Sequence, residues 1–157
     1  MVRFKSDSRL SSIKDLVILT QTDTTVGFVS QNGQKLGNIK SRDDSKPFIK
    51  VYDSLKTFLA CANRVPHAKK NLVRRSKQTS FIIKNKAFRI SKIHLNSQLL
   101  RDLHWHYSTS ANESSKNFDR DFCEDKADII IEDKNGLHEN VSSTLLKINN
   151  KKKVKIR

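Results

Sequence analysis

The chain has 157 residues, of which 36% are hydrophobic, so we expect a single domain, residues 1–157, with one core. Its 31 Lys and Arg against 16 Asp and Glu give a formal net charge of +15. That charge favours anionic partners such as RNA, nucleotides or acidic membrane surfaces, although a general Lys-rich composition would also produce it. Two cysteines are too few for a disulfide framework, and no apolar run is long enough for a signal peptide or a membrane span. We therefore expect a cytoplasmic protein with no membrane segment.

The first half of the chain alternates between short strands and helices. Runs rich in β-branched residues predict strands at 16–20 and 48–52. Apolar spacing predicts helices at 33–40 and 54–62, the second capped by Asp53 or Ser54. Residues 24–30 fit a loop that leads into either a strand or a helix.

The second half is richer in strands. A basic helix is expected at 68–75, and a short helix at 96–103. Strands are expected at 79–83, 87–90, 104–108, 127–131, 143–148 and 153–156, with the first two forming a hairpin and the last two a closing pair. Strands with interspersed helices predict a mixed α/β (α+β) fold built on one twisted sheet.

Three polar segments could carry chemistry. Residues 21–28 place hydroxyls, a carboxylate and Gly27 directly after a strand, where they could line a crevice and let a ligand approach the backbone. Lys40 and Arg42 could hold separate phosphate oxygens. Ser110 and Asn112 alternate in an extended segment, so their side chains should point to one side. Taken singly, each segment is equally compatible with a solvated loop or an Asn-centred turn.

Taken together and in order, these motifs resemble the YrdC-like threonylcarbamoyl-adenylate synthase family. The resemblance is carried by Thr-Asp-Thr-Thr-Val-Gly-Phe (22–28), Lys-Ser-Arg (40–42), Ala-Phe-Arg-Ile (87–90), Ser-Thr-Ser-Ala-Asn-Glu-Ser (108–114), Ser-Ser-Thr-Leu-Leu-Lys-Ile (142–148) and Val-Lys-Ile-Arg (154–157). It implies an open twisted sheet with a large electropositive cavity. It also implies an enzyme that makes threonylcarbamoyl-adenylate and pyrophosphate from ATP, L-threonine and bicarbonate.

The resemblance assigns roles by position. Lys40 and Arg42 match catalytic, phosphate-binding residues. ATP contacts are implied for Lys40, Arg42, Ser110, Asn112, Ser143 and Arg157. Threonine contacts are implied for Thr22, Thr24 and Arg89. Mg²⁺ would accompany ATP, held by phosphates and water rather than by a protein metal site. A separate transferase would pass the product to tRNA.

Two alternatives remain open. Val26 and Val51 stand where the family pattern has a tyrosine and often a histidine, which leaves room for an enzyme that adenylates a different substrate. The high charge also fits a non-catalytic RNA-binding module of the same fold, which would bind RNA directly, double-stranded RNA included. In that case Lys69, Lys70, Arg74 and Arg75 would be the local RNA-facing candidates.

Overall fold

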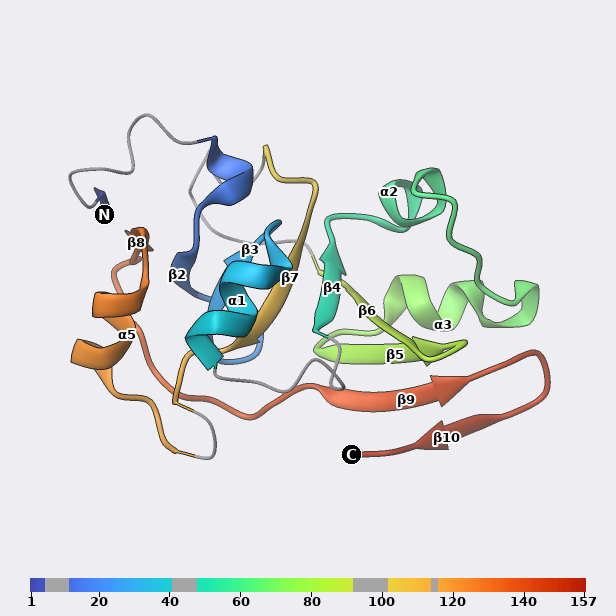
Figure 1. Ribbon diagram of the computed structural model, residues 1–157. Coiled ribbons are helices and arrows are strands. Elements are labelled where there is room, and N and C mark those ends of the chain that lie inside the picture. Colours follow the sequence, from blue (N-terminus) through green and yellow to red (C-terminus); the bar gives the residue numbers. More distant parts are fainter. Residues whose placement is uncertain (5–11, 41–47, 92–101, 114–115) are drawn as a thin grey trace.

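A computed structural model describes residues 1–4, 12–40, 48–91, 102–113 and 116–157 (Figure 1). The strands are β1 (Val2–Phe4), β2 (Ile18–Gln21), β3 (Val26–Ser30), β4 (Ile49–Tyr52), β5 (Thr79–Ile83), β6 (Lys86–Ile90), β7 (Trp105–Ser110), β8 (Ile129–Ile131), β9 (Thr144–Ile148) and β10 (Lys153–Lys155). The helices are α1 (Gly33–Lys40), α2 (Leu55–Ala60), α3 (Lys70–Arg75) and α5 (Arg120–Lys126), with 3-10 turns η2 (Ile13–Asp15) and η3 (His67–Lys69).

All strands of the described residues join in one sheet, in the order β1-β8-β2-β3-β7-β4-β6-β5-β9-β10. The pairs β2–β8, β4–β6 and β5–β9 are parallel and the other pairs are antiparallel. The predicted mixed α/β class with one open sheet is therefore confirmed.

The helices pack on one face of the sheet. Leu36 of α1 and Cys123 of α5 share a core cluster with Phe28 of β3. Phe58 of α2 and Val73 of α3 form a second cluster, which includes Phe88 of β6 and Phe81 of β5. Strand alternation puts all of these strand residues on the same face. Phe88 pairs with Phe81 and with Lys50, and Lys50 pairs with Tyr107. Tyr107 pairs with Ser30, which lies two residues from Phe28 in β3 and therefore on the same face.

The opposite face is apolar at one end and polar in the middle. Ile18, Val29 and Ile129 pack there against Leu103 in a third cluster. Further along, the same alternation brings His106, Ser108 and Ser110 of β7 to this face, with Arg89 of β6. This polar stretch positions the candidate site.

Most elements lie where the sequence predicts them, and residues 24–30 resolve into strand β3. Among the strands and α-helices, two were missed. The edge strand β1 is only three residues long, and α5 is dominated by charged residues with little apolar periodicity. Its sequence signal was the N-cap, since Asp119 accepts a hydrogen bond from the Phe122 N–H (3.0 Å). The helix expected at 96–103 lies almost wholly outside the described residues.

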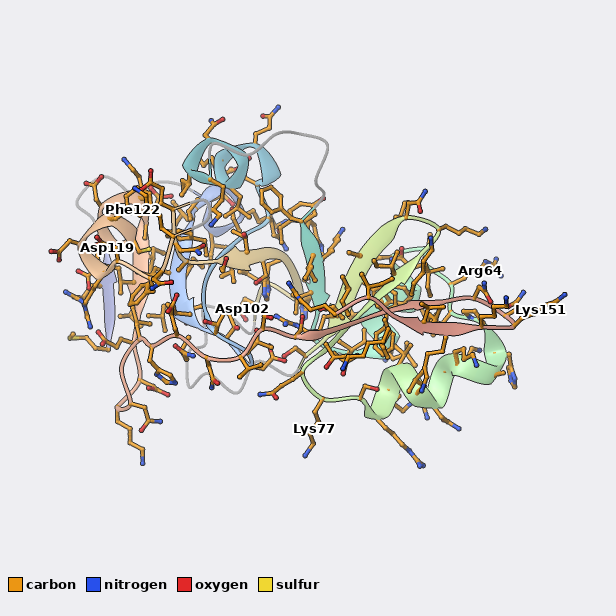
Figure 2. The ribbon with its side chains drawn as sticks, turned by 90° about the horizontal axis from the view of Figure 1, so that it is seen from below. Arg64, Lys77, Asp102, Asp119, Phe122 and Lys151 are labelled. Atoms are coloured by element: carbon orange, nitrogen blue, oxygen red, sulfur yellow. The ribbon has the colours of Figure 1, made fainter. Side chains whose placement is uncertain are left out.

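Positive charge is concentrated in one half of the molecule. Residues 48–91, which contain β4 to β6 with α2 and α3, carry eleven Lys and Arg and one acidic residue. Residues 144–157, which contain β9 and β10, add six more cations and no acid. Figure 2 shows Arg64 and Lys151 at this end and Asp119 at the other. Within the described parts of the chain, no helix is long and apolar enough to cross a membrane.

Candidate functional site

A cavity of about 300 Å³ lies on the polar face of the sheet. Six of the nine residues singled out from the sequence line it: Thr22, Thr24, Arg89, Ser110, Ser143 and Arg157. Residues from the β2–β3 loop, β6, β7 and the C-terminal region thus meet at one place. The sequence predicted this convergence through motifs, and the roles of the residues remain predictions.

Lys40, Ser110 and Asn112 form a second group that adjoins this cavity through Ser110. Lys40 ends α1 and is buried, and its Nζ donates to the Ser110 carbonyl oxygen (3.2 Å), the Asn112 carbonyl oxygen and Asn112 Oδ1. Ser110 Oγ also donates to Asn112 Oδ1 (2.8 Å). The ammonium group therefore organises the bend after β7, and a phosphate would have to replace one of these acceptors. The fourth predicted member of the group, Arg42, lies outside the described residues.

The loop between β2 and β3 is shaped by the hydroxyl of Thr22. Thr22 Oγ1 accepts from the N–H groups of Thr24 (3.2 Å) and Thr25 (3.3 Å) and donates to the Thr25 carbonyl oxygen (2.7 Å). A threonine that bonds its own backbone in this way fixes a tight turn. The turn directs Thr24 Oγ1 and the Asp23 carboxylate towards Arg89.

Arg89 is the most constrained charged group of the site. Its Nη1 donates to Thr24 Oγ1 (3.1 Å), and its Nη2 lies 3.3 Å from Asp23 Oδ1. Burial lowers the pKa of the guanidinium, and the Asp23 charge partly opposes this effect. Its Nε is buried and has no hydrogen-bond partner within the described residues. An orphaned donor on a buried cation suits an anionic group entering from the cavity.

His106 lies close to Arg89 on the same face. Both residues pair with Val51 of β4, His106 from β7 and Arg89 from β6. Burial, with a smaller contribution from the Arg89 charge, lowers the pKa of His106 to about 4, so the imidazole is neutral at pH 7. Strand alternation puts His106 and Trp105 on opposite faces of β7, but the local sequence gives no sign that the histidine is buried.

The C-terminal strands close the cavity on another side. The Oγ atoms of Ser143 and Ser80 lie 2.9 Å apart and are buried. Arg157 Nε donates to the Ser143 carbonyl oxygen (3.3 Å), so the end of the chain is held beside β9. Both Ser143 and Arg157 present polar groups to the cavity.

Gly27 has a packing role in addition to the one expected. A Cβ at this position would lie 2.9 Å from the Thr109 carbonyl oxygen and 3.1 Å from the Thr22 methyl group. The glycine therefore permits close packing between β3, β7 and the β2–β3 loop. Gly27 also lines the cavity, so its backbone remains accessible to a ligand there, as the sequence predicts.

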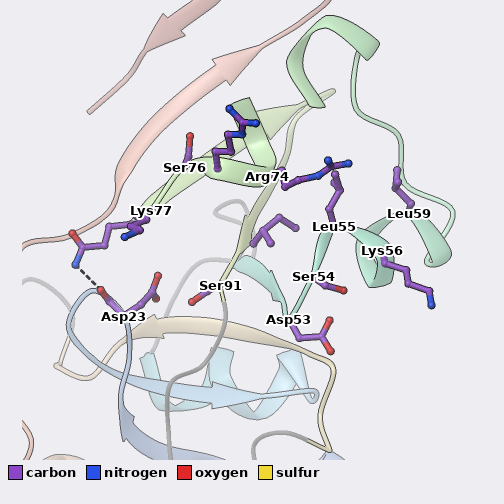
Figure 3. Close-up of a pocket in the computed structure, with 13 residues that line it drawn as sticks. Asp23, Asp53, Ser54, Leu55, Lys56, Leu59, Arg74, Ser76, Lys77 and Ser91 are labelled. Atoms are coloured by element: carbon purple, nitrogen blue, oxygen red, sulfur yellow. Dashed lines mark hydrogen bonds between the residues drawn. The ribbon is translucent and has the colours of Figure 1, made fainter. Parts of the chain in front are cut away.

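A larger cavity of about 1060 Å³ lies beside the first (Figure 3). Its lining includes the cations Lys56, Arg74, Arg75 and Lys77, the carboxylates Asp23 and Asp53, and the apolar Leu55, Leu59 and Ile90. The sequence had flagged Arg74 and Arg75 only as part of a basic helix. In the described part of the chain, no group of three or more His, Cys, Asp or Glu could hold a metal ion.

Comparison with known proteins gives a structural match only. No family profile and no curated protein sequence matches the chain. The structure of Sua5 from P. abyssi complexed with L-threonine superposes with a TM-score of 0.69 at 17% identity, covering 90% of this chain. The fold is YrdC-like.

Other structures share the YrdC-like fold. Full-length HypF, in a phosphate- and nucleotide-bound form, matches with a TM-score of 0.72 at 12% identity over 100% of this chain. HypF from T. kodakarensis matches with a TM-score of 0.71 at 14% identity over 92%. The chain spans about half the length of the Sua5 protein (50%) and about a quarter of the first HypF (25%). At these identities the likeness establishes the fold alone.

Proposed function

We propose that the chain is an L-threonylcarbamoyladenylate synthase. One observation carries the proposal: Ser110 lines the same cavity as Thr24 and Arg89, and it is bonded to Asn112 and to Lys40, which reaches it from the end of α1. The Lys40–Ser110–Asn112 group suits phosphate oxygens and the Thr24–Arg89 pair suits a carboxylate. Such a pairing of groups would serve a nucleotide at one end and an amino acid at the other. The L-threonine bound to Sua5 and the nucleotide bound to HypF are consistent with this proposal.

The proposed reaction has two steps. The threonine amine attacks bicarbonate, and loss of water leaves a carbamate on the amino nitrogen. A carbamate oxygen then attacks the α-phosphorus of ATP, the bond to the bridging oxygen breaks, and pyrophosphate leaves. Lys40, together with Arg42, would stabilise the negative charge that grows on the departing pyrophosphate.

The other residues position the reactants. Ser110 and Asn112 would orient the α-phosphate, with Ser143 and Arg157 on the nucleotide side. Arg89 would pair with the threonine carboxylate through its free Nε, and Thr22 and Thr24 would shape that end of the cavity. Mg²⁺ would enter with ATP and be held by phosphates and water. A separate transferase would then pass the threonylcarbamoyl group to tRNA.

Pyrophosphate release tests this proposal. The assay contains ATP and Mg²⁺, with threonine and bicarbonate each added or omitted, and compares the wild type with Lys40→Ala. Lys35→Ala, on the same helix but exposed, is the matched control. Release that requires both co-substrates and Lys40, and is retained by Lys35→Ala, supports the synthase. No release from folded protein contradicts it, and release with another amino acid in place of threonine identifies a different substrate.

RNA binding is the second candidate function, and the charge distribution favours it. The eleven cations of residues 48–91 and the six of residues 144–157 lie in the same half of the molecule. A basic lobe of this kind is an electrostatic footprint for a polyanion. Filter binding of double-stranded RNA at two salt concentrations tests it, because phosphate contacts make affinity fall steeply with salt. Binding that is absent or independent of salt would rule it out.

A further inference from the structure

The larger cavity is lined by cationic side chains on one part of its surface and by apolar side chains on another. Arg74 and Arg75 end α3, and Lys77 follows the helix by two residues. Leu55 and Leu59 of α2, with Ile90 at the end of β6, supply apolar walls. Figure 3 shows Arg74 on the upper side of the cavity and Asp23 and Asp53 on the lower side. Leu59 is 39% exposed, so its side chain is accessible to an apolar group in the cavity.

The two carboxylates of the lining already have partners. Asp23 pairs with Arg89. Asp53 accepts hydrogen bonds from Thr57 and from His104 Nδ1 (3.0 Å). Burial alone would raise the pKa of Asp53, but hydrogen bonds from Thr57, His104 and Ser54 outweigh burial and lower it. Both acids are therefore committed to the fold rather than to the cations across the cavity.

The cations of the lining, unlike the two carboxylates, have no charged partner among the described residues. Within the residues that the structure describes, Arg74, Arg75 and Lys77 form no ion pair. The carbonyl of Leu72, near the end of α3, is capped instead by the N–H and hydroxyl of Ser76. These three cations thus line the cavity, and neither an ion pair nor the capping of α3 explains their position.

We propose that this cavity is a second ligand site, which binds a small phosphorylated molecule with an apolar portion. A phosphate group would take the charge-assisted hydrogen bonds of Arg74, Arg75 and Lys77. An inorganic anion alone would leave Leu55, Leu59 and Ile90 in contact with water, and a neutral apolar ligand would leave the cations unused. A volume of about 1060 Å³ suits a ligand of metabolite size.

The second site shares a wall with the first. Asp23 lines the larger cavity, and its partner Arg89 lines the smaller one. Gln78, also in the larger cavity, donates from Nε2 to the Asp23 carbonyl oxygen (2.8 Å), shown as the dashed line in Figure 3. An occupant of the larger cavity would therefore lie next to the Arg89 end of the smaller cavity, away from Lys40.

Calorimetric titration of the full chain with phenyl phosphate, in the absence of ATP and threonine, tests the proposal without relying on any activity. Phenyl phosphate should bind more tightly than inorganic phosphate. Arg74→Ala/Arg75→Ala should weaken phenyl phosphate roughly tenfold or more, as expected for lost hydrogen bonds to a charged group. Leu59→Ser should weaken phenyl phosphate a few-fold and leave inorganic phosphate unchanged.

Two control variants distinguish binding in the larger cavity from a general charge effect and from binding in the smaller cavity. Lys151→Ala/Lys152→Ala removes the same charge from an exposed turn, and Lys40→Ala alters the smaller site. Neither should change the affinity for phenyl phosphate by more than twofold. An equal loss in the Lys151→Ala/Lys152→Ala variant would reduce the effect to net charge, and loss in Lys40→Ala alone would place the probe in the smaller cavity. Either result overturns the proposal, as would a protein that binds RNA through Arg74 and Arg75 but does not bind phenyl phosphate.

Discussion

Asp23 and Arg89 form an ion pair in which the arginine is almost fully buried, with 5% of its side chain exposed against 21% for the aspartate. The pair joins the β2–β3 loop to β6 and separates the two cavities. Its geometry makes Arg89 dependent on Asp23, because a buried cation without a counter-charge is costly.

Replacing Asp23 by Asn should therefore destabilise the protein by roughly 2–4 kcal/mol. Urea unfolding at pH 7 measures the change. The double variant Asp23→Asn/Arg89→Met removes both charges and should recover part of the loss. If the losses of Asp23→Asn and Arg89→Met simply add, the two residues are not energetically coupled.

Asn112→Asp should lower nucleotide affinity while leaving the fold intact. The new carboxylate would lie within ion-pair distance of Lys40 Nζ, since Asn112 Oδ1 already accepts its hydrogen bond. The positive charge offered to a phosphate would then be neutralised, and binding of an ATP analogue should weaken about tenfold or more. Glu113→Gln, one position along, is a control that should not weaken binding. Unchanged affinity in Asn112→Asp would remove Lys40 from the phosphate site.

The buried His106 should make the protein acid-sensitive. Its pKa is about 4 in the folded state, below its ordinary value of 6.5, so the unfolded chain binds the proton more readily between these two pH values. Stability should accordingly fall as the pH drops from about 6.5 towards 4, by up to roughly 3 kcal/mol from this residue. His106→Gln should flatten the pH profile of the urea midpoint in this window. A profile unchanged by His106→Gln would contradict the assignment.

Two glycines provide a matched test of packing. Gly27→Ala places a Cβ 2.9 Å from the Thr109 carbonyl oxygen and should cost about 2 kcal/mol while displacing the Thr22 turn. Gly37→Ala, in α1 with no atom within 4 Å of the added Cβ, should stabilise by up to about 1 kcal/mol. Thermal unfolding measures both changes. A Gly27→Ala protein as stable as the wild type would mean that β3 and β7 can move apart.

Gln78 has a strained backbone conformation, and its side chain is hydrogen-bonded to the β2–β3 loop; this hydrogen bond is called the tether. Its φ of 47° lies in the left-handed region, and its side chain holds the Asp23 carbonyl. Gln78→Gly should relieve the backbone and Gln78→Ala should not, so glycine should be the more stable variant by about 1 kcal/mol. Both lose the tether, so both should raise the KM for the amino acid to a similar extent. If KM rises only in the less stable of the two variants, Gln78 has a structural role only.

Local patterns predicted much of the fold. Apolar alternation and turn residues located the β5–β6 hairpin, and the cap predicted at Asp53 or Ser54 marked the start of α2, whose N-cap is Ser54. The resemblance to the YrdC-like family also grouped Lys40 with Ser110 and Asn112, although they come from distant segments. These features are encoded within a few consecutive residues or in a shared motif.

What the sequence did not predict depends on long-range pairing. The partner of Arg89 could not be chosen among many acids without knowing that the Thr22 turn folds over β6. The burial of His106 follows from its place in the middle of the sheet, next to Val51, rather than from its neighbours in sequence. The larger cavity is assembled from four separate segments, so no single motif contains it.

The open edge of the sheet at β10 has one further consequence. An exposed strand can pair with the same strand of another molecule and begin aggregation. Here Lys153 and Lys155 belong to that edge strand, with Lys151 and Lys152 just before it, so two such edges repel each other. That repulsion is screened as ionic strength rises, because the Debye length shrinks from about 10 Å at 0.1 M to about 3 Å at 1 M salt. We therefore expect these lysines to disfavour edge-to-edge pairing of the sheet, most strongly in dilute salt.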